Sequence, residues 1–97
     1  MSFRQDGVFP VTVTDAFLGA PKFALGKNNS DNQPNNRGEA VQVWFDVVLK
    51  VETADGQWDY WHGEISNRSG TGNSSDKVRW ELTLATLAEI GFQLNSI

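Results

Sequence analysis

The clearest pattern in the chain is an alternation of apolar and mixed positions between residues 41 and 51. The odd positions are all apolar: Val41, Val43, Phe45, Val47, Leu49 and Val51. The even positions are a mixture of polar and apolar residues: Gln42, Trp44, Asp46, Val48 and Lys50. A period of two residues is typical of a β-strand that buries one face. Turn residues follow at Ala54-Asp55-Gly56, so Ala40 to Ser66 is predicted to form one long antiparallel hairpin.

The turn leaves two strand registers open. A two-residue turn centred on Asp55-Gly56 would place Thr53 opposite Trp58. A turn with Gly56 in the left-handed conformation would place Thr53 opposite Gln57. The choice matters because a shift of one residue moves every later side chain to the other face of the sheet.

The hydrophobic pattern favours the second register. In the first register Glu64 would lie on the buried face, where an unpaired carboxylate is strongly unfavourable. In the second register Trp61 and Ile65 take that face instead. We therefore predict that Leu49 faces Trp61 and that Phe45 faces Ile65.

The segments around the hairpin predict a further strand and two loops. Gly7 to Ala16 is predicted to form a strand. Proline donates no ladder hydrogen bond, so either this strand lies at a sheet edge or Pro10 lies near the start of the strand. Lys22 to Leu25 is expected to form another short strand. Lys27 to Gly38 contains five Asn and no apolar side chain, which predicts a mobile loop in which no side chain offsets the cost of ordering. Asn67 to Asp76 is a second loop, rich in Gly and Ser.

A helix is predicted near the end of the chain. Ser75 or Asp76 would cap it and it would run to about Ile90. Its apolar stripe, which should pack on the sheet, consists of Trp80, Leu84, Leu87 and Ala88. Gly91 suits the left-handed position after a helix, with Phe92 turning back onto Leu87.

These elements predict one domain over residues 1–97 that is mainly β in an α+β arrangement. The hairpin would build an antiparallel sheet or a partly open barrel of the oligonucleotide-binding type, with the C-terminal helix covering one face. Phe92 to Ile97 is expected to add a short strand. The chain has no Cys, no apolar run long enough to span a membrane and no export signal at its start, so we expect a cytoplasmic protein.

The even face of the hairpin is the best candidate for a function. The net charge is −4, from 8 basic and 12 acidic residues, which argues against binding by general phosphate neutralisation. Binding of single strands depends more on aromatic side chains that stack with bases. The predicted nucleic-acid-binding residues are Trp44, Lys50, Trp58 and Tyr60, with Arg37 and Arg68 from the bordering loops. The alternative is that these aromatic side chains form core on both sides of a barrel or sandwich.

Other chemistry has less support. His62 is the sole His, and without Cys there is no nucleophile arrangement apart from one built around it. His62, Glu64 and Asp46 could together form a metal site with one His and two carboxylate ligands. The alternative is a partly exposed His beside solvated acidic side chains. Gly70 and Gly72 lack the remaining residues of a phosphate-binding loop. We assign no catalytic residue, no metal and no cofactor.

The order of these features resembles that of small phage-encoded proteins of the replication and recombination cluster that are treated as single-stranded-DNA-binding-like. The residues that carry the resemblance are Thr14-Asp15-Ala16, Trp44-Phe45-Asp46-Val47, Tyr60 to Ser66 and Leu87 to Phe92. The resemblance implies a phage or prophage origin and an oligonucleotide-binding-like β architecture. Such proteins commonly end in an acidic tail that recruits partners, whereas this sequence ends at Asn95-Ser96-Ile97.

We therefore expect a non-enzymatic protein that binds single-stranded nucleic acid in phage replication or recombination, in the cytoplasm of a bacterial host. One alternative is a small acidic phage protein that binds and inhibits a host protein. Its signature would be clustered carboxylates with the aromatic side chains buried. Another is a virion or assembly component that forms homo-oligomers through a free sheet edge.

Overall fold

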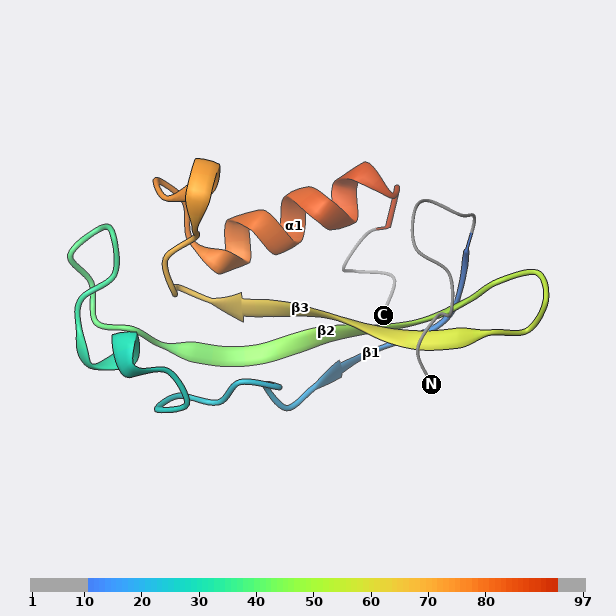
Figure 1. Ribbon diagram of the computed structural model, residues 1–97, viewed down its shortest axis with the longest axis horizontal. Coiled ribbons are helices and arrows are strands. Elements are labelled where there is room, and N and C mark those ends of the chain that lie inside the picture. The colour runs from blue at the N-terminus through green and yellow to red at the C-terminus, as the bar shows by residue number, and fades with distance from the viewer. Residues whose placement is uncertain (1–10, 93–97) are drawn as a thin grey trace.

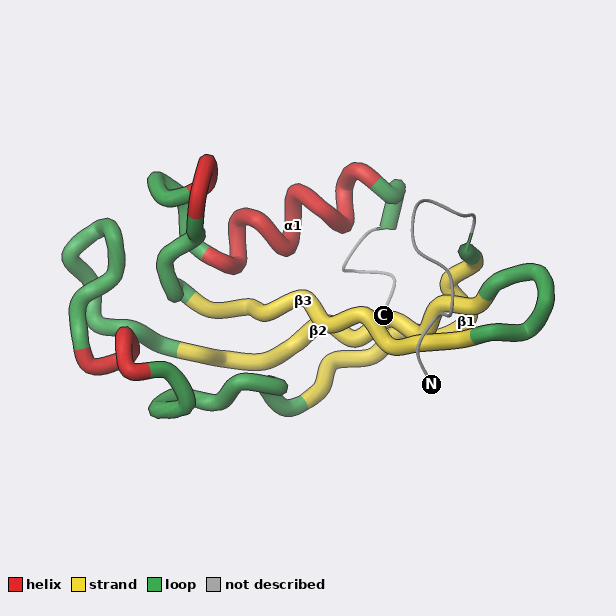
Figure 2. The backbone as a smooth tube through the Cα atoms, in the orientation of Figure 1, coloured by secondary structure: helices red, strands yellow, loops and turns green. Residues whose placement is uncertain are grey.

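The computed structural model describes residues 11–92, in which an antiparallel sheet carries a helix on one face (Figure 1). The elements are β1 (Thr12–Gly19), η1 (Asn29–Asn32), β2 (Val43–Glu52), β3 (Trp58–Ser66), η2 (Gly72–Ser74) and α1 (Arg79–Glu89). The three strands lie in the order β1-β2-β3, and Figure 2 shows the long loop between β1 and β2. The predicted α+β class is confirmed, and within residues 11–92 the sheet is open. No helix in this range is long and apolar enough to cross a membrane.

The hairpin has the register that the hydrophobic pattern predicts. The Thr53 amide donates to the Gln57 carbonyl at 2.8 Å, and the Gly56 amide donates to the Thr53 carbonyl at 3.1 Å. Gly56 has a φ of +88°, the left-handed conformation that this turn requires. Both predicted pairs are present, Leu49 with Trp61 and Phe45 with Ile65.

The core lies between the odd face of the hairpin and α1. Val47 and Leu49 of β2 and Leu87 of α1 are at most 2% exposed and form its centre. The partly buried side chains around them are Ala16, Phe45, Val51, Trp61, Ile65 and Phe92. This packing confirms that the helix covers one face of the hairpin.

Helix α1 approaches β3 most closely at Gly63. A Cβ atom on Gly63 would lie 2.5 Å from the Thr83 methyl carbon and 2.5 Å from the Trp61 ring, closer than real contacts. The Thr83 hydroxyl also donates to the Glu64 carbonyl at 2.8 Å. Glycine is therefore required here because the helix and a tryptophan fill the space of a side chain.

The predicted start of the helix was wrong. Helix α1 begins at Arg79, after a cap at Val78, and not after a cap at Ser75 or Asp76. An isolated β-bridge keeps Val78 extended, so the chain cannot turn into a helix before it. The Glu81 carboxylate accepts a hydrogen bond from the Val78 amide at 3.2 Å, which satisfies one of the free donors at this end.

The predicted buried stripe of the helix was also wrong in part. Thr83 and Leu87 are the buried residues of α1, whereas Trp80 is 37% exposed, Leu84 is 38% exposed and Ala88 is exposed. The helix rests on the glycine of β3, and the short branched side chain of Thr83 fits that gap. The packed face is consequently rotated away from the larger side chains.

The predicted end of the helix is confirmed. Gly91 has a φ of +74°, the Phe92 amide donates to the Leu87 carbonyl at 2.9 Å, and the Gly91 amide donates to the Ala88 carbonyl at 3.1 Å. This pair of bonds is the Schellman arrangement. The strand predicted for Phe92 to Ile97 lies outside the described residues beyond Phe92.

Two predictions for the N-terminal half need correction. The first strand runs from Thr12 to Gly19, later than the predicted Gly7 to Ala16, and residues 7–10 lie outside the described part. Among residues 11–92 it lies at the edge of the sheet, which is one of the two positions that Pro10 indicated. Lys22 to Leu25 form no strand, because this segment leaves the sheet and is held by the side chains of Asp46 in β2 and of Arg68 in the loop after β3.

Candidate functional site

The sheet face opposite to α1 carries a row of three aromatic side chains, Phe17, Tyr60 and Trp58, called here the aromatic row. The ring centroids of Phe17 and Tyr60 are 6.4 Å apart at 72°, and those of Trp58 and Tyr60 are 5.7 Å apart at 73°. These are edge-to-face contacts, which support each ring in a fixed orientation. Phe17 is 41% exposed and Tyr60 is 45% exposed, so the described residues leave much of the row open.

The strand pairing places these rings on one face. Phe17 of β1 pairs with Val48 of β2, and Tyr60 of β3 pairs with Lys50. Val48 and Lys50 are even positions of β2, whose odd positions point toward α1. The row therefore crosses the sheet from edge to edge and depends on the register described above.

Lys50 is the predicted cation that the structure brings to the aromatic row. Its Nζ lies 5.0 Å from the centroid of the Trp58 ring. Such a cation–π contact at a partly exposed site is worth about 0.5–1 kcal/mol. The contact holds a positive charge beside the rings, at a strength that a ligand phosphate can compete with.

The structure separates the other predicted residues from the row. Trp44 is 49% exposed and lies at a β-bulge, six positions and about 20 Å along β2 from Lys50. Arg37 pairs with Glu81 of α1. Arg68 is 7% exposed and lies inside an ion-pair cluster. Phe17 was missed because it follows the predicted end of the first strand, and only its pairing with β2 brings it to Tyr60.

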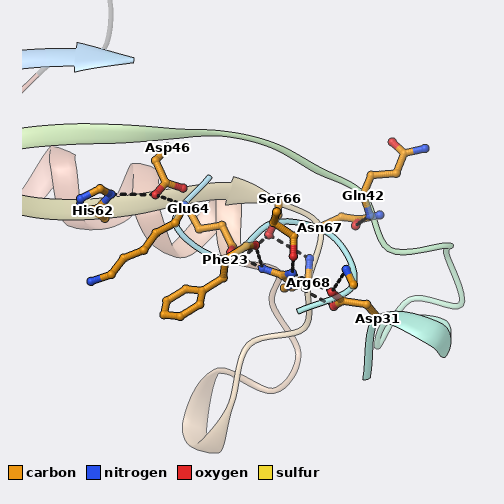
Figure 3. Close-up of polar contacts among 12 residues, drawn as sticks. Phe23, Asp31, Gln42, Asp46, His62, Glu64, Ser66, Asn67 and Arg68 are labelled. Atoms are coloured by element: carbon orange, nitrogen blue, oxygen red, sulfur yellow. Dashed lines mark hydrogen bonds and ion pairs between the residues drawn. The ribbon is translucent and has the colours of Figure 1, made fainter. Parts of the chain in front are cut away.

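The Arg68 cluster lies at the other end of the same sheet face and is drawn in Figure 3. The guanidinium donates to both carboxylate oxygens of Asp31, at 2.9 and 2.7 Å, and to Glu64 at 2.5 Å. It also donates to the carbonyl oxygens of Phe23 and Ala24, at 2.7 and 2.9 Å. All five N–H donors of an arginine side chain are thus used.

Charge pairing shifts the titration of this cluster. The hydrogen bond from Arg68 is the main cause that lowers the pKa of Asp31 from 3.8 to about 2. The same contact is the main cause that raises the pKa of Arg68. The cluster joins the loop after β1 to the end of β3 and keeps both groups charged.

Asparagine side chains hold the polar loop that was predicted to be mobile. The Asn35 amide nitrogen donates to the Asn67 carbonyl at 2.7 Å, and that of Asn36 donates to the Ser75 and Lys77 carbonyls at 2.5 and 2.7 Å. Asn35 is 8% exposed. The premise that no side chain in this loop offsets its ordering was wrong, because the amides replace apolar packing with hydrogen bonds to distant backbone.

A cavity of about 610 Å³ lies between this loop, the even face of β2 and β3, and the loop before α1. Asp46 lies at the edge of this cavity and is 1% exposed. Its Oδ2 atom lies 2.9 Å from His62 Nδ1 and accepts a hydrogen bond from the Lys22 amide at 3.0 Å. Since Asp46 and Glu64 face each other across the strands, these donors and Arg68 explain why two opposed carboxylates are tolerated. Residues 11–92 contain no group of His and acidic side chains that could hold a metal ion.

Comparison of the chain with known protein families, with curated proteins and with solved structures finds no match. The aromatic row and the cavity are therefore the features of this chain that bear on its function.

Proposed function

We propose that this protein binds single-stranded nucleic acid, without catalysis, by stacking bases on the aromatic row. The observation that carries the proposal is the exposure of Phe17 and Tyr60 side by side on a sheet face that the helix does not cover. Bases stack on flat aromatic side chains irrespective of sequence, and each stack is worth about 1–3 kcal/mol. A sheet holds the rings at fixed spacing, so little conformational entropy is lost on binding.

The charges near the row suggest moderate affinity with a weak salt dependence. Lys50 is the cation beside the rings, and the whole chain carries a net charge of −4. One neutralised phosphate on a single strand gives a slope of about −0.7 in a plot of log affinity against log salt. Stacking on the three rings of the row supplies about 3–9 kcal/mol, and the upper half of this range corresponds to dissociation constants of tens of micromolar or less.

The resemblance to phage single-stranded-DNA-binding-like proteins is consistent with this proposal and suggests a role in phage replication or recombination. The alternative, an acidic inhibitor of a host protein, requires buried aromatic side chains. The open rings of Phe17 and Tyr60 favour the stacking proposal over that alternative.

A fluorescence titration of a labelled oligonucleotide, at low and moderate salt, tests the proposal. Tyr60→Ala and Phe17→Ala should each weaken binding about 5- to 150-fold, the loss of one stacked base. The matched control is Trp80→Ala, because Trp80 is 37% exposed on the helix and lies away from the row. Absence of binding by the wild-type protein at tens of micromolar would refute the proposal, as would an equal loss in the control.

A further inference from the structure

The cavity beside the Arg68 cluster is lined by two cations that form no ion pair within residues 11–92. The three acidic groups that line it are already paired, Asp46 with His62, and Asp31 and Glu64 with Arg68. Lys22 and Arg79 also line it, and within residues 11–92 neither has a carboxylate within ion-pair distance. The lining has three carboxylates and three Lys or Arg side chains, and Lys22 and Arg79 are the two of these cations that remain available to an anion.

The position of Arg79 is unfavourable for the stability of the fold. It is the first residue of α1, and a cation at the N-terminus of a helix opposes the helix dipole. It is also partly buried, which removes water from a charge that has no ion-pair partner among residues 11–92. An anion in the cavity would satisfy this side chain and account for its position.

The remaining walls suit a ligand with a flat apolar part. Phe23, Pro34 and Val41 supply apolar surface, and Ser69 and Thr71 supply hydroxyl groups. Figure 3 shows the Phe23 side chain standing apart from the polar contacts of the Arg68 cluster. A volume of about 610 Å³ lies in the range of small-molecule sites. An anionic group joined to a flat ring system is the chemistry of a nucleotide.

We propose that this cavity binds a nucleotide, with its phosphate monoester against Lys22 and Arg79 and its base against Phe23. This inference rests on the proposed function in one respect, since it takes the nucleotide to be the phosphorylated end of the bound strand. His62 lines the cavity and lies two positions from Tyr60 on the same face of β3. Two positions span about 7 Å of strand, so a strand stacked on the aromatic row reaches the edge of the cavity at His62, and the Arg68 cluster lies further along the same face.

The test is calorimetry of the full chain with one oligonucleotide, prepared with and without a terminal phosphate, and with a free nucleoside monophosphate. Charge-assisted contacts predict that the phosphorylated strand binds about tenfold tighter or better. Arg79→Gln and Lys22→Gln should each reduce this advantage. Arg37→Gln is the matched control, because Arg37 pairs with Glu81 and does not line the cavity, and it should keep the advantage.

The outcomes separate this inference from the proposed function. If both strands bind equally, the cavity proposal is wrong and the aromatic row stands. If neither strand binds but the monophosphate does, with a loss in Arg79→Gln, the cavity proposal holds for free nucleotides and the strand proposal is wrong. If the monophosphate does not bind and the phosphate gives no advantage, the cavity proposal is overturned. Lys22→Gln keeps the test decisive should Arg79→Gln unfold, since Lys22 is exposed.

Discussion

Replacement of Arg68 by Met should be among the most damaging single changes in this protein. The side chain of Arg68 is 9% exposed and holds two carboxylates and two backbone carbonyls, so Met would fill a similar volume and remove every one of these donors. Asp31 and Glu64 would then lie in place with their charge uncompensated. The damage would come mainly from these groups and not from lost packing, because Met keeps the aliphatic stem.

The expected magnitude follows from the burial of the pair. Removal of one partner of a buried ion pair typically costs about 3–5 kcal/mol, because the other charge stays behind. A domain of this size loses about 4–8 °C in melting temperature per kcal/mol, so a fall of at least about 12 °C is expected. The control is Arg37→Met, whose side chain is 40% exposed and has a single partner, and it should cost about 0.2–1 kcal/mol.

Urea denaturation followed by tryptophan fluorescence would measure both variants, and amide hydrogen exchange would locate the loss. Exchange should accelerate first in residues 23–31, which Arg68 joins to β3. A double-mutant cycle with Asp31→Asn should return a large coupling, since the two side chains share two hydrogen bonds. If Arg68→Met costs no more than Arg37→Met, the cluster is not a stabilising element and the reasoning fails.

Three further predictions concern pH, the helix contact and the helix face. The pKa of Asp31 is lowered from 3.8 to about 2. Its contribution to the free energy of unfolding is therefore complete above pH 3.8 and is lost as the pH falls through about 2. Carboxyl NMR titration would measure the pKa, and acid denaturation would measure the loss of stability. Gly63→Ala should cost about 1–3 kcal/mol in urea denaturation, whereas Gly19→Ala, where a Cβ would be 3.4 Å from its neighbour, should cost much less. Leu87→Ala should cost about 2–5 kcal/mol and Leu84→Ala far less, because they are 2% and 38% exposed; equal losses would contradict the corrected helix face.

The hairpin and its register could be predicted from the sequence because the information is local. The alternation of β2 leaves one buried face, and a carboxylate at Glu64 excludes the register that would bury it. The end of the helix was predictable for a similar reason, since Gly91 and Phe92 form a short motif whose hydrogen bonds close within a few residues. Local patterns of this kind do not depend on how distant segments meet.

The features that were missed depend on contacts between distant segments. Arg68 looked like a surface cation in a polar loop, and its burial follows from Asp31, which lies 37 positions away. Phe17 joins the aromatic row only because β1 pairs with β2. The helix begins late because Val78 is drawn into a bridge with Ser69, a pairing that the composition of this loop does not indicate.

Arg68 also links the stability of the fold to the charge of the cavity. With Arg68 in place, Asp31 and Glu64 are held in ion pairs, and the cations of the cavity lining without an ion pair among residues 11–92 are Lys22 and Arg79. Without it, two carboxylates would cancel these cations and an anion would lose its attraction. The aromatic row lies at the opposite end of the sheet face and takes no part in this cluster. A change at Arg68 should therefore abolish a preference for phosphate while leaving the stacking surface intact, provided the chain remains folded.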